Sequence, residues 1–81
     1  MRILIYSGLN NSYYIVSEEN AHKIPKEILN EIPKEKDKFN GDTDLLYSIG
    51  VNPRVNEIIK KISKNELLSN LREKGFLKVV L

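Results

Sequence analysis

The two ends of this chain are short apolar runs that cannot stay in water. Phe76–Leu81 has five apolar residues among its six, and Arg2–Tyr6 has four among its five. Runs of this length and composition are typical of strands that are covered on both faces. Burial of such side chains is strongly favourable. We therefore expect both ends of the chain to meet in one sheet, with the last strand beside the first.

A dense turn signal follows the first run. Ser7–Ser12 contains Gly8 and two Asn residues, which tolerate the positive φ angles that hairpin turns require. Tyr13–Val16 is rich in residues that favour strands. The chain is therefore predicted to begin with a β-hairpin.

Short helices are predicted in the middle of the chain. A proline at its first position favours a helix from Pro25 to Glu31, and the acidic residues of 42–44 favour a helix start that Gly50 would stop. Asn52 is placed to cap a third helix, which has apolar residues at i, i+3, i+4 and i+7 from Val55 to Ile62. The charged segment 34–41 is predicted to be a loop, with Asn40-Gly41 as its turn.

The last helix carries signals at both of its ends. Ser63 and Glu66 have the spacing of a capping box, in which each side chain satisfies the backbone N–H of the other residue. Gly75 is placed to end the helix in the left-handed conformation. The helix is therefore predicted to cover residues 64–74.

These elements predict one α+β domain over residues 1–81. It has an N-terminal β-hairpin, three to four short helices and a C-terminal strand that returns to a small three-stranded sheet, with the helices on one face. Such a sheet has two open edges and an apolar second face. A homodimer would cover both.

Composition excludes several classes of protein. The proportions of hydrophobic (41%) and charged (30%) residues are globular rather than disordered. The chain has no cysteine, which excludes disulfides, thiolate metal sites and cysteine nucleophiles. No apolar run approaches the roughly 20 residues of a membrane helix, and no signal peptide is recognisable. We expect a cytoplasmic protein without a membrane partner.

No catalytic constellation is recognisable, and we expect no metal site and no cofactor. This favours a role without catalysis, and a small protein-interaction or regulatory module is the first hypothesis. Adjacent Tyr13 and Tyr14 point to opposite faces of a strand, so we expect one ring to be exposed as an interface anchor. Val79 and Leu81 complete the candidate interface.

The alternative is a nucleic-acid-binding protein that uses the helix pair 52–74. Residues 52–81 carry seven Lys or Arg against three Glu, and phosphates attract such a basic segment. The candidate contacts are Lys60, Lys61, Lys64, Arg72 and Lys74. The stretch 63–78 also resembles the step from recognition helix to wing in winged-helix regulators, although a wing needs a hairpin and only one strand follows here.

A ligand site at a dimer seam is the third hypothesis. The backbone amides of Ser7–Ser12 would cradle a phosphate, and Asp42 with Asp44 would bind a cation. A plain hairpin turn and helix capping explain the same residues more simply.

Overall fold

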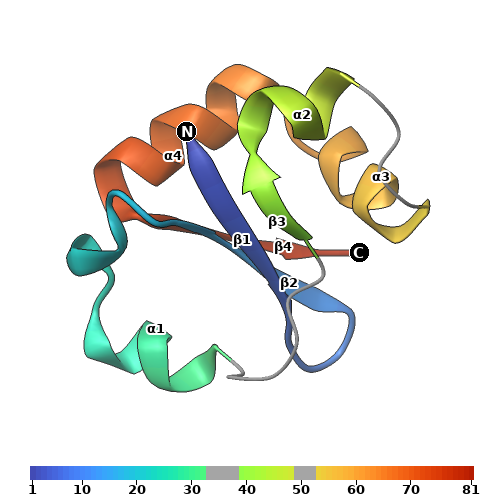
Figure 1. Ribbon diagram of the computed structural model, residues 1–81. Helices are drawn as coiled ribbons and strands as arrows, with labels where there is room; N and C mark the ends of the chain where they lie inside the picture. The colour runs from blue at the N-terminus through green and yellow to red at the C-terminus, as the bar shows by residue number, and fades with distance from the viewer. Residues whose placement is uncertain (33–38, 49–52) are drawn as a thin grey trace.

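The computed structural model describes residues 1–32, 39–48 and 53–81. Its elements in chain order are β1 (Arg2–Ser7), β2 (Ser12–Ser17), the 3-10 helix η1 (Ala21–Lys23), α1 (Lys26–Glu31), β3 (Phe39–Asp42), α2 (Thr43–Ser48), α3 (Pro53–Lys60), α4 (Lys64–Lys74) and β4 (Phe76–Val80). Figure 1 shows α2, α3 and α4 on one side of the sheet and α1 on the other. The predicted α+β class is confirmed. Among the described residues, no helix has the length and apolar character needed to cross a membrane.

The sheet has four antiparallel strands in the order β3-β1-β2-β4. The prediction of three strands, with the last beside the first, is therefore wrong in both respects. β4 pairs with β2, because β3 takes the outer edge of β1, with Ile5 opposite Phe39.

Strand β3 forms within a segment that the sequence predicts as a loop. Asn40 and Gly41 lie inside the strand, opposite Leu4 and Ile3, rather than in a turn. Asn, Gly and Asp are poor strand formers. Phe39 is buried in the core, and the edge of β1 supplies backbone partners, so tertiary context outweighs local propensity. Residues 34–38 of the predicted loop lie outside the described residues, as do the predicted stop at Gly50 and cap at Asn52.

The predicted hairpin turn is confirmed. Asn10 and Asn11 have φ angles of 55° and 59°, and the Ser12 amide donates to the Leu9 carbonyl at 3.1 Å. Positive φ at both central residues gives the turn a backbone twist that matches the twist of the two paired strands. The local sequence therefore fixes how β1 and β2 pair.

The first face of the sheet carries the hydrophobic core. Alternate residues of each strand point to this face, and α2, α3 and α4 pack their apolar sides on it. The buried cluster contains Ile3, Ile5, Tyr13, Ile15, Phe39, Leu46, Val55, Ile58, Leu67, Leu71 and Val79. The apolar spacing predicted for the third helix is confirmed, since Val55 and Ile58 are fully buried and Ile59 and Ile62 pack against the cluster.

The second face is covered in part by η1 and α1. Ile24, between these two helices, is buried, and the Tyr14 hydroxyl donates to Glu31 Oε2 at 3.0 Å. The prediction that all helices lie on one face is therefore wrong. A second copy of the chain is not needed to cover the strands below η1 and α1, because the chain's own residues 20–31 already do so.

Helix α4 has the ends that the sequence predicts. The Ser63 hydroxyl accepts from the Glu66 amide at 3.2 Å. Gly75 has a φ of 82°, and its amide donates to the Leu71 carbonyl at 3.0 Å. Glycine is required at position 75 for a second reason, because a Cβ there would overlap the Asn20 carbonyl oxygen. This close approach brings the start of β4 against the segment that covers the second face.

We expect Gly75→Ala and Gly75→Asn each to lower the free energy of unfolding by about 1–3 kcal/mol. Both variants add the Cβ that overlaps Asn20, although Asn tolerates positive φ better than Ala does. Urea denaturation measures the change, with the exposed Lys74→Ala as control. Full stability of Gly75→Asn would show that the φ angle alone requires glycine.

Candidate interaction edge and adjoining cleft

One edge of the sheet is formed by β4. The Ser17 amide donates to the Gly75 carbonyl, and the Leu81 amide donates to the Asn11 carbonyl, both at 3.0 Å. Backbone groups of an antiparallel strand alternate in direction, so the odd-numbered residues of β4 bond to β2. The N–H and C=O groups of Phe76, Lys78 and Val80 therefore point away from the sheet. Among the described residues nothing bonds to these groups, and we call them the β4 edge.

The side chains of β4 alternate between core and solvent. Val79 faces the core and is buried, while Lys78 and Val80 point to the second face and are exposed. Val80 has 58% of its surface exposed, which is unusual for a valine in a strand. The β4 edge therefore combines free backbone groups with an accessible apolar side chain.

A cleft of about 530 Å³ opens on the second face beside β4. It is lined by Leu9 and Asn10 of the hairpin loop, by Ser12 and Tyr14 of β2, by Asn30 and Glu31 at the end of α1, and by Lys78 and Val80 of β4. Leu9 is 85% exposed. The cleft thus has an apolar rim at Leu9 and Val80 and charged groups at Glu31 and Lys78. We call it the β4 cleft.

Tyr14 lies between the two charged groups of the β4 cleft. Its hydroxyl donates to Glu31, and the Lys78 ammonium lies 5.6 Å from its ring centroid, within the range of a cation–π contact. Gly8 leaves room for the ring, because a Cβ there would lie 2.9 Å from Cε2 of Tyr14. The glycine of the hairpin loop is therefore required by this close approach, whereas the positive φ angles fall on the two Asn residues.

The residues predicted for an interface are mostly buried. Tyr13 and Tyr14 do point to opposite faces, but each is only 4% exposed. The expectation of one exposed ring is wrong because the chain covers both faces at β2. Val79 belongs to the core, and Leu81 is half-buried against it. The role of these four residues in an interface stays a prediction.

Sequence reasoning missed Val80, Leu9 and Glu31. Glu31 is distant in sequence from β4, and only the tertiary structure brings it to Tyr14. A signal for the edge was present, since Lys78 is the one charged residue in an otherwise apolar run. Lysines of this kind commonly mark edge strands.

The basic residues predicted for nucleic acid fall into two groups. Lys60, Lys61 and Lys64 lie around the turn between α3 and α4, whereas Arg72 and Lys74 lie at the other end of α4. At 1.5 Å per residue, eight residues of helix separate the groups by about 12 Å. All five are exposed, but Lys64 is paired with Asp44 at 3.0 Å. The strand after α4 pairs with β2 and forms no wing.

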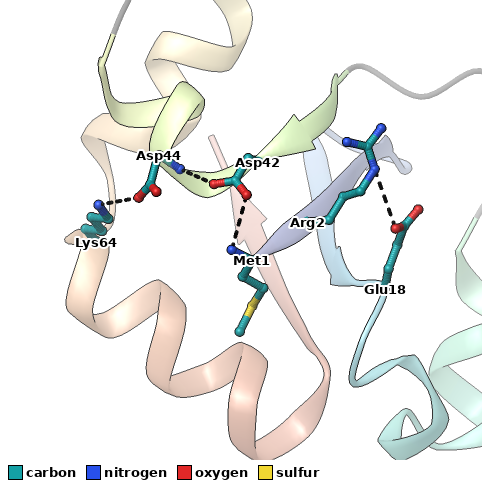
Figure 2. Close-up of polar contacts among 6 residues, drawn as sticks. All are labelled: Met1, Arg2, Glu18, Asp42, Asp44 and Lys64. Atoms are coloured by element: carbon teal, nitrogen blue, oxygen red, sulfur yellow. Dashed lines mark hydrogen bonds and ion pairs between the residues drawn. The ribbon is translucent and has the colours of Figure 1, made fainter.

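The two aspartates at the start of α2 have structural partners. Asp42 Oδ1 accepts from the Asp44 amide at 2.9 Å, and Asp42 Oδ2 lies 3.4 Å from the Met1 ammonium (Figure 2). The hydrogen bond from the Asp44 amide is the main cause that lowers the pKa of Asp42, and the positive charges of Met1 and Arg2 contribute. These contacts support helix capping as the role of Asp42, whereas the carboxylate of Asp44 pairs with Lys64 at 3.0 Å.

Comparison with family models, with curated proteins and with solved structures finds no match to this chain. Within the residues that the structure describes, no group of three or more His, Cys, Asp or Glu side chains is placed to hold a metal ion.

The lowered pKa of Asp42 predicts an acid-sensitive contribution to stability. A carboxyl whose folded pKa is depressed stabilises the fold above its unfolded value, near 3.8, and this contribution is lost as the pH falls through the folded value. We expect the wild type to lose stability more steeply than Asp42→Asn as the pH falls below about 3.8, because Asn keeps the cap without titrating. Urea denaturation over a pH series tests this. Parallel curves for the two proteins would contradict it.

Proposed function

We propose that the protein is a small protein-interaction module that works as a homodimer, and that two copies pair along the β4 edge. The observation that carries the proposal is the row of free backbone groups at Phe76, Lys78 and Val80. Such an edge is a template for another strand. Pairing with a second copy would join two four-stranded sheets into one.

Side chains support the same surface. A strand added beside β4 would cover part of exposed Val80 and of half-buried Leu77 and Leu81. Burial of apolar surface contributes about 25 cal/mol per Å². One strand pair is nevertheless a small interface, so we expect a dimer that dissociates on dilution.

The charge of Lys78 selects the register of this pairing. The outward-pointing N–H and C=O groups belong to every second residue of β4. In a symmetric antiparallel pair, the residue that lies opposite its own copy is therefore either Lys78 or a neighbouring odd-numbered residue. Centring on Lys78 would place two ammonium groups directly opposite each other, which is unfavourable. Centring on Val79 instead places Lys78 opposite the partner's Val80. We propose this second register.

A second candidate function is nucleic-acid binding through the turn between α3 and α4. The observation that favours it is that Lys60 and Lys61 are exposed there and, within the described part of the chain, make no ion pair. Binding of this kind weakens steeply with salt. Reversal of charge at Lys60, Lys61 and Lys64 would abolish it, and reversal at the β4 edge would not.

Two substitutions of Val80 test the homodimer. Val80→Pro removes an outward N–H without removing a hydrogen bond to β2, and we expect it to be monomeric. Val80→Thr keeps that N–H and the strand propensity, and we expect it to dimerise more weakly than the wild type. Light scattering at low and high salt, with and without mixed nucleic acid, measures the mass.

Hydrogen exchange locates the pairing. At low concentration the amides of Phe76, Lys78 and Val80 should exchange fast and those of Leu77 and Val79 slowly. At high concentration the amides of Lys78 and Val80, which pair with the partner in the register centred on Val79, should become protected as well, whereas that of Phe76 should stay fast. A wild-type monomer at every concentration would overturn the homodimer. A mass increase with nucleic acid at low salt alone would favour the second candidate.

A further inference from the structure

We infer that the β4 edge and the β4 cleft together form a docking site for an extended acidic polypeptide, which joins the sheet as a fifth strand. The inference rests on the use of the β4 edge that the proposed function assigns, and it does not require the homodimer. It names a second class of partner for that edge, one that would compete with a second copy of the chain.

The surroundings of β4 carry a net positive charge, and the one carboxylate among the described residues that line the β4 cleft, Glu31, accepts a hydrogen bond from Tyr14. Residues 72–81 contain Arg72, Lys74 and Lys78 against Glu73 alone. Lys23 adds a further ammonium, since its Nζ donates to the Arg72 carbonyl at 2.6 Å. Within the described residues, none of these four cationic side chains makes an ion pair. Charge complementarity therefore favours an acidic partner.

The geometry of strand addition fixes where the acidic residue lies. Alternate side chains of an added strand point to the two faces of the sheet, so the residue opposite Lys78 lies on the second face, beside the β4 cleft. A carboxylate there would meet the Lys78 ammonium. Direct opposite-charge pairs of this kind stabilise strand pairing.

The neighbouring positions of the added strand call for apolar residues. On the second face, the residue opposite Val80 lies next to the rim that Val80 and exposed Leu9 form. On the first face, the residues opposite Leu77 and Val79 adjoin the core. The motif read along the partner strand is thus apolar, apolar, acidic, apolar. Main-chain hydrogen bonds would supply affinity, and these side chains specificity.

A second copy and a nucleic acid each satisfy one of two requirements, which are pairing with the strand edge and a match to the positive charge. A second copy brings the same basic side chains to the seam, and its Lys78 cannot supply the carboxylate. A nucleic acid satisfies the positive charge, but it does not offer the alternating N–H and C=O groups that a strand edge pairs with. The acidic peptide satisfies both requirements.

Two capped synthetic peptides test the inference: Ser-Ile-Val-Glu-Val-Thr-Ser and its counterpart with Lys in place of Glu. Binding is followed by NMR shifts of the β4 amides, at a concentration where light scattering shows the monomer. The proteins are the full-length wild type, Lys78→Glu and the matched control Lys61→Glu, which reverses the same charge at the far end of α4.

We expect the wild type to bind the Glu peptide about three- to tenfold more tightly than the Lys peptide. Lys78→Glu should reverse this preference, and Lys61→Glu should keep it. Val80→Pro should weaken both peptides, and the shifts should centre on Phe76, Lys78 and Val80. Circular dichroism confirms that each variant is folded.

Three results would overturn the inference. They are no binding of either peptide, a preference that Lys78→Glu leaves unchanged, and tighter binding of a duplex DNA that Lys78→Glu abolishes. A protein that dimerises and binds neither peptide would overturn this inference alone. A protein that stays monomeric and binds the Glu peptide would overturn the homodimer alone.

Discussion

Strand β2 holds the sheet together, because β1 pairs with it on one side and β4 on the other. All six of its residues are buried, because it pairs on both sides and is covered on both faces. Tyr13 and Ile15 join the core under the helices, while Tyr14 and Val16 face η1 and α1. A strand in this position has no free backbone edge for a partner, and only Ser12 and Tyr14 reach the lining of the β4 cleft. Any interaction through the sheet must therefore use the strands at its edges.

The two edges of the sheet are not equivalent. β3 is four residues long and passes directly into α2, whose first turn is held by Asp42. β4 follows a long, well-capped helix and presents three outward-facing residues. Natural sheets commonly protect their edges by shortening them or by adding charge. Here β3 is protected because it is short, and Lys78 on β4 restricts which strands can pair there.

The candidate site shows why its residues could be predicted from the sequence only in part. The basic character of residues 52–81 was visible, but α4 divides its cations between two distant ends. The tyrosines were recognised as a cluster, yet their burial depended on a segment that the sequence predicted to lie elsewhere. The β4 cleft required Glu31 from α1, Leu9 from the hairpin loop and Lys78 from β4 to meet. Such meetings depend on long-range packing, which no local pattern encodes.

The features that depend on local hydrogen bonds could be predicted from the sequence. These are the turn at Asn10 and Asn11, the cap at Ser63 and the helix end at Gly75, where each residue acts within four positions of itself. Long-range packing, in contrast, places Asn40-Gly41 in a strand, pairs β4 with β2 and brings α1 over the second face (Figure 1). Each of these outcomes is a competition among distant segments for the same backbone groups and the same apolar surface. The arrangement that forms is the one with the most favourable total burial and strand pairing, to which local propensity adds little.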